Sequence, residues 1–390
     1  MRGYIRRPDG RRHQGWQAVC DVGPDPGTGR RRQRSRTFPT KREAEDWLAS
    51  QVHSVRSGTY TDPEHLTLSE YLERWLAGLS LAVELGSLAA NTVSWYRGAV
   101  RGHIVPCLGA LRLRQLTPEV LAEFYADRLR RGRLDGQGGL SATSVRRLHV
   151  TLHRALAKAV RDGLLVRNPA SLVDDKPRAD TPDPTERVWG GRQLEAFLEY
   201  VAEDRLYAAW RLTAWTGMRR GEVCGLRWSD VDLDGARLSV RETRVLVDGR
   251  PERSQPKRDA SRRSVELDPE TVAALREWRR HQLEERLRWG EAWADTGFVF
   301  TREDGSPLRP DWLTKRFARL SVQAGLSRLT PHGLRHTHGT ALLVAGVDSR
   351  IVQERLGHAS VAITQDLYQS VLPGLQRQAL RQLTEWLTEG

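Results

Sequence analysis

The chain has few of the features that mark secreted, membrane-spanning or disulfide-bonded proteins. Its 390 residues include only three cysteines, far apart and odd in number: Cys20, Cys107 and Cys224. This count excludes a disulfide framework and a cysteine-rich zinc site. No apolar run approaches the roughly 18 residues of a membrane span, and no apolar signal-peptide core follows the basic start of the chain. We therefore expect a soluble protein that works in the cytoplasm and has no membrane partner.

Lysine is also scarce, although the chain is strongly basic. Only five of the 62 basic residues are lysines, and the others are arginines. The net charge is +13 at pH 7, and the 39% of hydrophobic residues suffice for the cores of two or three domains. Because guanidinium groups bind phosphate bidentately, we expect a polyanionic partner, and nucleic acid is the obvious one. The alternative is a merely basic globular protein.

Residues 1–60 hold a disproportionate share of this charge, with thirteen basic and six acidic residues. Residues 16–22 alternate like a strand, 30–38 read as a second, basic strand, and 41–53 as a helix. We predict a small three-stranded sheet backed by one helix, with arginines on its free face for DNA contact. The expected contact residues are Arg30, Arg31, Arg32, Arg34 and Arg36. A flexible basic tail is the alternative, but disordered arms rarely carry spaced large aromatics such as Trp16, Phe38 and Trp47.

Residues 67–172 have the pattern of a helical domain. Thr67 to Glu70 form a capping box, residues 90–104 read as a second helix, Pro118 starts a third, and Ser141 caps a fourth over 142–162. The fourth helix has an apolar stripe and a separate cationic face of Arg147, Arg154, Lys158 and Arg161. This face could contact a DNA duplex, and a solvated basic face is an equally good interpretation.

Residues 173–186 are proline-rich and aperiodic, which predicts a linker before a last domain over 187–390. Most of that domain reads as helical, with a β-rich patch at 236–267 in which Asp248-Gly249 signals a hairpin turn. The expected fold class is therefore α+β multidomain: the N-terminal sheet and helix, a helical domain, and a mostly α domain with a small antiparallel sheet.

Four segments of the last domain could carry chemistry. They are TGMRRGEVCGLRWSDVD at 216–232, QPKRDASRRS at 255–264, TPHGLRHTH at 330–338 and LGHASVAITQDLY at 356–368. In the third, Thr330 can cap a helix that places His332 and Arg335 on one face of its first turn. Each segment also has a plain structural interpretation, such as a packing tyrosine, core histidines or surface arginines.

Together, the four segments resemble the tyrosine recombinase (phage-type integrase) family. The family signature is Arg…Lys…His-x-x-Arg…His/Trp…Tyr, which Arg219, Lys257, His332, Arg335, His358 and Tyr368 match in order. The N-terminal basic sheet resembles the arm-site-binding domain of heterobivalent integrases, and residues 67–170 look like the family's core-binding domain. Two neighbouring positions depart from the pattern: Gly333 stands where many relatives have an acid, and Gln369 where small residues or His are common.

The resemblance implies a mechanism that needs no metal or other cofactor. Tyr368 would be the nucleophile, and Arg219 and Arg335 would stabilise charge on the scissile phosphate. Lys257 would act as general acid, His332 would exchange the phenol proton, and His358 would donate a hydrogen bond to the phosphate. The resemblance also implies double-stranded DNA attachment sites as partners, a homotetramer on DNA, and a host architectural protein and an excision factor.

The apolar stripe of Leu375, Ala379, Leu380, Leu383 and Trp386 predicts a C-terminal tail helix. We expect it to dock on a neighbouring subunit, and docking on its own domain is nearly as plausible.

Three other functions remain open: a type IB topoisomerase, a catalytically inert DNA-binding regulator, and a metal-dependent nuclease. The nuclease would use His332, His336 and His338, yet no carboxylate lies between Thr330 and Val347 to complete its metal site.

Overall fold

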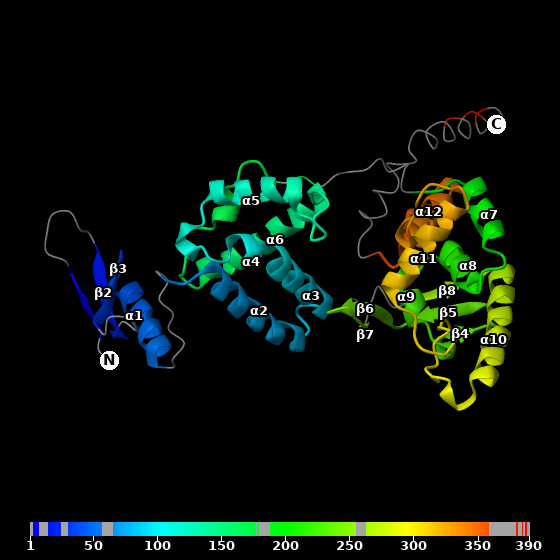
Figure 1. The fold of residues 1–390 in the computed structure, drawn as a ribbon, viewed down its shortest axis with the longest axis horizontal. Coiled ribbons are helices and arrows are strands. Elements are labelled where there is room, and N and C mark those ends of the chain that lie inside the picture. The colour runs from blue at the N-terminus through cyan, green and yellow to red at the C-terminus, as the bar shows by residue number, and fades with distance from the viewer. Residues whose placement is uncertain are drawn as a thin grey trace. The chain divides into compact units, whose positions relative to one another are not determined.

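The computed structural model describes residues 3–7, 15–24, 30–56, 65–176, 178, 188–254, 263–358, 380, 384 and 387. The chain folds into two compact units, one formed by residues 1–87 and 96–179 and the other by 88–95 and 180–390. The observed elements have the predicted fold class of an N-terminal sheet, a helical part and a mostly helical part with small sheets (Figure 1). None of the helices in the described ranges could cross a membrane.

The N-terminal part is a three-stranded antiparallel sheet in the order β1-β2-β3 with helix α1 against it. The bounds are Gly3–Arg6 for β1, Trp16–Pro24 for β2, Arg31–Phe38 for β3 and Lys41–Arg56 for α1. Ala18 and Cys20 of β2 and Ala44 of α1 are buried, which is the period-2 core face of a strand meeting a helix. Sequence patterns did not identify β1, whose four residues are held by pairing with β2.

The helical part that follows contains α2 to α6. Their bounds are Leu68–Glu84, Ala90–Ala99, Val105–Leu108, Pro118–Arg131 and Ala142–Arg161. A π-helical turn, η1 (Val100–Ile104), joins α3 to α4, so the predicted helix over 90–104 continues to Leu108. Thr67, Thr117 and Ser141 cap α2, α5 and α6 with their side chains. Tyr71 of α2 donates to the carbonyl oxygen of Ala155 in α6 at 2.6 Å, so these helices are fixed by a buried hydrogen bond.

In the second unit, the described residues between 188 and 358 form seven α-helices and two small antiparallel sheets. The helices are α7 Gly191–Tyr200, α8 Tyr207–Thr216, α9 Arg220–Gly225, α10 Pro269–Trp289, α11 Pro310–Gln323, α12 Pro331–Val344 and α13 Ser349–Leu356. Strands β4 Val231–Asp232, β5 Arg237–Val240 and β8 Arg263–Glu266 form one sheet, and β6 Thr243–Val247 and β7 Arg250–Ser254 form a hairpin. Asp248 and Gly249 both have positive φ and make the predicted hairpin turn.

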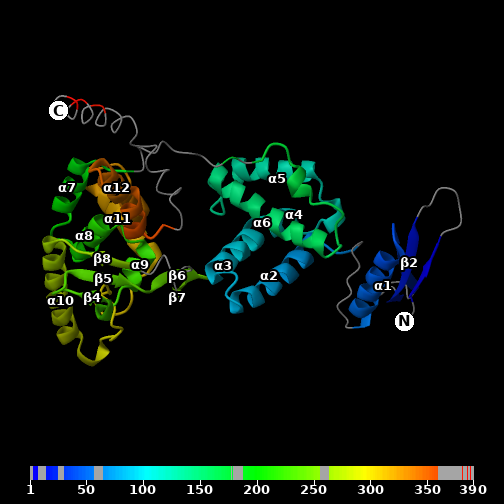
Figure 2. The same cartoon turned by 180° about the vertical axis from the view of Figure 1, so that it is seen from behind.

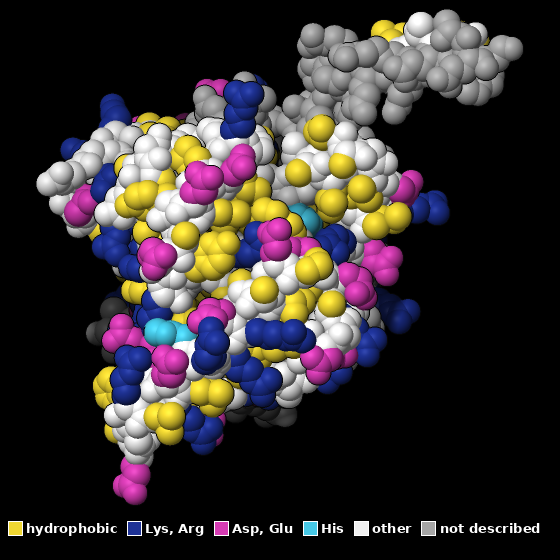
Figure 3. All heavy atoms as spheres, turned by 90° about the vertical axis from the view of Figure 1, so that its right-hand side faces the viewer, with side chains coloured by type: hydrophobic (Ala, Val, Ile, Leu, Met, Phe, Trp, Pro, Cys, Tyr) yellow, Lys and Arg dark blue, Asp and Glu magenta, His cyan; other side chains and the backbone are white. Residues whose placement is uncertain are grey.

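Helix α8 is the centre of this unit. Seven of its side chains, from Ala208 to Ala214, are buried, because α10 packs on one side of the helix and α12 on another (Figures 1 and 2). An aromatic cluster of Trp189, Phe197, Trp210 and Phe317 fills the space between α7, α8 and α11. The face at the right of Figure 1, where α7 and α10 lie, mixes hydrophobic side chains with charges of both signs (Figure 3).

Candidate active site

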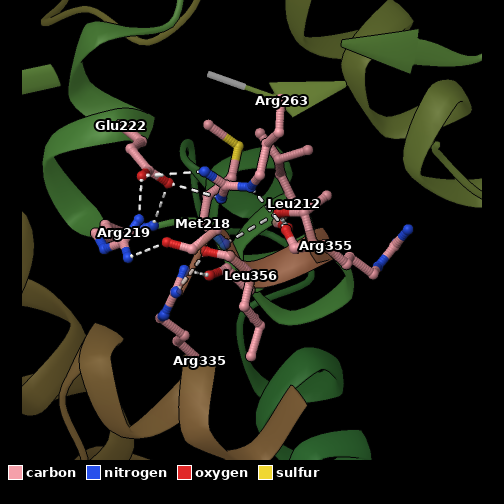
Figure 4. Close-up of polar contacts among 11 residues, drawn as sticks. Leu212, Met218, Arg219, Glu222, Arg263, Arg335, Arg355 and Leu356 are labelled. Carbon is pink, nitrogen blue, oxygen red and sulfur yellow. Dashed lines mark hydrogen bonds and ion pairs between the residues drawn. The ribbon is translucent and has the colours of Figure 1, made fainter. Parts of the chain in front are cut away.

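The first candidate arginine, Arg219, lies in the turn between α8 and α9. Gly217 ends α8 in the left-handed conformation with φ 61°, and Arg219 begins α9 as its N-cap residue. The carboxylate of Glu222 accepts from the Arg219 backbone N–H at 2.9 Å and from its Nη1 at 2.7 Å. Glu222 therefore fixes both the start of α9 and the direction of the Arg219 guanidinium (Figure 4).

The second candidate arginine, Arg335, points from α12 toward the same turn. Its Nη1 donates to the carbonyl oxygen of Gly217 at 2.6 Å and its Nη2 to that of Leu356 at 2.5 Å. Thr330 caps α12 by accepting from the Gly333 N–H at 3.3 Å, as the sequence predicted. The side chain is only 2% exposed, so Arg335 joins the ends of α8 and α13 from inside the domain.

Three arginines meet at the C-terminal end of α13. Arg263 donates through Nε to the carbonyl oxygen of Arg355 at 2.7 Å, Arg335 to that of Leu356, and Arg219 through Nη2 to that of Gly357 at 2.8 Å. The last carbonyls of a helix lack intrahelical partners and carry partial negative charge, so they attract cations. This end of α13 thereby collects side chains from β8, α12 and the α8–α9 turn (Figure 4).

The charges of this cluster perturb its titratable groups. Burial raises the pKa of the Glu222 carboxyl, but its hydrogen bonds with Arg263 and the charges of Arg263 and Arg219 outweigh burial and lower it. Burial and the nearby charge of Arg219 lower the pKa of Arg335 to about 9. His358 directly follows the α13 end and is 6% exposed. Burial, with Arg335 and Arg219 nearby, lowers the pKa of His358 to about 3, so the imidazole is neutral at pH 7.

These features create a site suited to an oxyanion. Among the described residues, one carboxylate, that of Glu222, lies within hydrogen-bonding distance of Arg219, and Glu222 is shared with Arg263. Cationic groups that depress one another's pKa are stabilised by an anion placed between them. The structure thus brings together three of the six sequence-predicted residues, Arg219, Arg335 and His358.

The three histidines of the third segment differ in exposure and in contacts. His332, in the first turn of α12, is exposed, and its ring makes an edge contact with His336 at 4.4 Å between centroids. His338 is buried on another side of the helix, and its Nε2 accepts from Nε of Arg355 at 3.2 Å. In the described ranges, no three His, Cys, Asp or Glu side chains gather as potential metal ligands. The remaining two predicted residues, Lys257 and Tyr368, and most of the predicted tail helix lie outside the described residues.

The DNA-contact arginines expected in β3 do not all lie on the free face of the sheet. Arg34 pairs with Cys20, which faces α1, and it donates to Oε1 of Gln51 in that helix at 3.1 Å. The expectation is wrong for Arg34 and also for Arg36, which pairs with the buried Ala18 on the same side of the sheet, because side chains alternate along a strand and only every second residue can face away from α1. Arg30 and Arg31 are exposed, and Arg31 pairs with Asp21 at 2.6 Å. Arg32 is half-buried, and Arg36 lies over the ring of Phe38.

The cationic face predicted for α6 is present. Arg147, Arg154, Lys158 and Arg161 are all exposed, whereas Val145, Leu148, Leu152, Leu156 and Ala159 are buried. Arg154 donates to the Tyr96 hydroxyl at 3.0 Å, and Lys158 pairs with Asp162 one turn later. This surface is compatible with phosphate contact, and its side chains are partly held in place.

The family motif gives no role to Glu222 or Arg263, although both lie in the four segments that could carry chemistry. Glu222 stands three residues after Arg219, the spacing of an N-terminal capping pair, which was a usable signal. Arg263 and Val265 are two residues apart and share the buried face of β8. The alternation of the strand therefore places the Arg263 guanidinium inside the domain.

Comparisons with known proteins agree with this architecture. The family model described as "Phage integrase family" matches residues 190–373, and "Arm DNA-binding domain" matches residues 5–53. A tyrosine recombinase XerC-like protein of Caldanaerobacter subterraneus is 27% identical over 363 residues, 89% of this chain and 90% of that protein. An integrase of Streptomyces ambofaciens is 26% identical, over 95% of this chain and 93% of its own length.

Two solved structures show the same fold. The Tn1549 transposon integrase in complex with transposon right end DNA has a TM-score of 0.63 at 20% identity, over 80% of this chain and 100% of that chain. The lambda integrase tetramer bound to a Holliday junction has a TM-score of 0.57 at 18% identity, over 94% of each chain. At these identities the likeness concerns the fold.

Proposed function

The chain belongs to the tyrosine recombinase family of phage-type integrases, and we propose that it is a site-specific DNA recombinase that integrates or excises a mobile element. It would cleave and rejoin DNA through a 3′-phosphotyrosyl intermediate. The observation that carries the proposal is the pair of guanidinium groups, Arg219 and Arg335, held on adjacent carbonyls at the end of α13 beside His358. Similar proteins named integrase come from a mycobacterial phage and from Streptomyces, which supports a mobile element.

The proposed reaction conserves the energy of the phosphodiester bond. The Tyr368 oxygen attacks the scissile phosphorus, a phosphorus–tyrosine bond forms, and the bond from phosphorus to the 5′ oxygen breaks. His332 accepts the phenol proton and Lys257 gives a proton to the leaving 5′ oxygen. The 5′ hydroxyl of a partner strand then attacks the phosphotyrosine in the reverse sense, which rejoins the DNA and frees Tyr368.

The two arginines would stabilise the charge that develops on the non-bridging oxygens. An arginine has five N–H donors. Arg219 uses two nitrogens to bind Glu222 and Gly357. Arg335 uses two to bind Gly217 and Leu356. These bonds orient the guanidinium groups before DNA arrives, so little reorganisation is needed in the transition state. Loss of one such donor costs roughly 10²–10³ in rate. His358, neutral at pH 7, would donate a further hydrogen bond from its ring N–H.

The remaining modules would position the DNA. Residues 1–60 would bind arm sites, in line with the arm-domain match over 5–53. Residues 67–172 would bind the core site together with the catalytic residues 187–390, after a linker at 173–186. The exposed basic side chains of α6 and of β3 are the candidate phosphate contacts in the first two modules.

Assembly and control follow the same proposal. A homotetramer would form on the DNA, with the tail around Leu375 to Leu387 docked on a neighbouring subunit; the lambda integrase tetramer on a Holliday junction supports such an assembly. A host architectural protein and an excision factor would be further partners. The protein would act in the cytoplasm, associated with the nucleoid when bound to DNA.

A suicide substrate tests the proposal directly. The DNA carries an attachment site from beside the protein's own gene and a nick that lets the released strand diffuse away. The wild-type protein should form covalent adducts, also in EDTA, and Tyr368→Phe should bind the DNA equally well but form none. Adducts in the Tyr368→Phe variant would refute the assigned nucleophile. Relaxation of a plasmid that lacks any attachment site would indicate a topoisomerase, and no cleavage of any attachment-site DNA would indicate an inert regulator.

A further inference from the structure

The proposed reaction gives no role to Arg263, the first residue of β8. Its side chain is 4% exposed, so it offers almost no surface to DNA. Nevertheless it donates to the described residues through Nη1 to Oε1 of Glu222 at 3.2 Å, through Nη2 to Oε2 of Glu222 at 2.9 Å, and through Nε to the carbonyl oxygen of Arg355 at 2.7 Å. A buried guanidinium that contacts both a carboxylate and a helix end needs an explanation.

The carboxylate that Arg263 binds is the one that orients Arg219. Each oxygen of Glu222 receives a hydrogen bond from both arginines: Oε1 from the two Nη1 atoms, and Oε2 from Nη2 of Arg263 and the backbone N–H of Arg219. Glu222 is 4% exposed, so water cannot replace a lost partner. Without Arg263, Arg219 would be the one ion-pair partner left to this buried carboxylate among the described residues.

The second contact of Arg263 supports the same site from the other side. The carbonyl of Arg355 directly precedes those of Leu356 and Gly357, which hold Arg335 and Arg219. Arg263 therefore fixes the turn of α13 on which both guanidinium groups rest and after which His358 follows. Figure 4 shows Arg263 between Glu222 and Arg355, so both contacts support the two candidate arginines indirectly.

We propose that Arg263 is a positioning residue for DNA strand cleavage: it neutralises Glu222, so that Arg219 stays available for the scissile phosphate, and it fixes the end of α13. This inference rests on the proposed function. The role of Arg263 differs from that of Arg219 and Arg335. Arg263 would neutralise Glu222 and fix the geometry of the site, and would not contact the substrate.

The test measures single-turnover cleavage of the suicide substrate by the full-length protein. Arg263→Met should lower the maximal cleavage rate by roughly 100-fold, the size of a lost charge-stabilising donor, and change the half-saturating protein concentration less than about threefold. Arg263→Lys, which keeps the charge but cannot reach Glu222 and Arg355 together, should lie between wild type and Arg263→Met.

Two further measurements separate positioning from a general loss of folding. A methylphosphonate at the scissile position replaces one charged oxygen by a methyl group, so stabilisation by Arg219 matters less and the Arg263→Met defect should shrink at least tenfold. In Glu222→Gln/Arg263→Met, the buried charge is gone and Arg219 is released, so the double variant should cleave the phosphodiester about tenfold faster than Arg263→Met.

Arg205 provides a matched control in the same unit. It donates bidentately to Glu285, which is 4% exposed, at 2.6 Å to each oxygen, and to the carbonyl oxygen of Thr301 at 3.0 Å. Arg205→Met thus removes a similar set of bonds away from the site, and its cleavage rate at saturation should equal that of wild type. Thermal unfolding of each variant measures any loss of fold.

The outcomes distinguish this inference from the proposed function. If wild type forms no adducts on either substrate, the proposed function fails. If wild type cleaves and Arg263→Met and Arg263→Lys cleave equally fast, Arg263 has no positioning role. A defect of equal size on phosphodiester and methylphosphonate, without recovery in the double variant, would likewise overturn the inference.

Discussion

Gly217 is the point at which the candidate site is most sensitive to a single added methyl group. It ends α8 with φ 61°, and its carbonyl oxygen accepts from Arg335. A Cβ atom at this position would lie 2.5 Å from Cδ2 of Leu356 and 2.9 Å from Cδ2 of His338. Gly217→Ala therefore adds two costs: the left-handed backbone of a residue with a Cβ, and a collision with the end of α13.

The two costs can be separated with a second glycine. Gly346 also has a left-handed backbone, with φ 80°, but its added Cβ would have no neighbour within 4 Å. Gly346→Ala should lower the free energy of unfolding by the backbone cost alone, about 1–2 kcal/mol. Gly217→Ala should lose about 1–3 kcal/mol more, the usual cost of overpacking.

Urea unfolding of the full chain, followed by tryptophan fluorescence, measures both variants, and the suicide substrate measures cleavage. We expect Gly217→Ala to bind DNA but to cleave it at least tenfold more slowly, because Leu356 must move and its carbonyl holds Arg335. Gly346→Ala should cleave like wild type. Equal losses of stability in the two variants, with equal cleavage rates, would refute the reasoning that the α8–α13 contact positions the arginines.

Three other predictions concern single side chains. Arg335→Lys cannot bridge the carbonyls of Gly217 and Leu356, so single-turnover cleavage should fall roughly 10²–10³-fold; an unchanged rate would contradict its role. The folded pKa of His338, about 3, lies below its ordinary value of 6.5 because of burial and Arg355, so its contribution to stability is present above pH 6.5 and is lost as pH falls toward 3. His338→Gln should flatten urea-measured stability over this range, by at most about 1.4 kcal/mol per pH unit, and an unchanged slope would argue against it. Arg147→Ala on α6 should reduce the salt slope of DNA binding by about one, whereas a sequence-dependent loss would indicate base contact.

Local signals predicted much of the fold. Ser141 and the apolar stripe placed the fourth helix at 142–162, and the structure has α6 at Ala142–Arg161. Asp248-Gly249 predicted the β6–β7 hairpin, because few other dipeptides tolerate two positive φ angles. Strand β1 was missed as a segment, because its four residues gain their conformation from pairing with β2. The faces of Arg34 and Arg36 were missed because they depend on strand register.

The sequence likewise predicted some residues of the candidate site and not others. The order of motif residues indicated Arg219, Arg335 and His358, and these lie together although 139 positions separate the first from the last. No sequence pattern connects Arg263 with them, because its role depends on which face of β8 is buried and on what lies beneath. Such supporting residues are visible only once the packing is known.

The end of α13 explains how two like charges can be held close together before the substrate binds. Carbonyl oxygens at a helix end carry only partial charge, so they orient Arg219 and Arg335 while leaving most of their attraction for a full anion. In the described part of the chain, Arg219 binds one fully charged carboxylate, that of Glu222. Arg263 binds the same carboxylate and so shares its charge. A phosphate that enters therefore meets oriented guanidinium groups whose mutual repulsion it relieves, and that gain is largest when its charge is greatest, in the transition state.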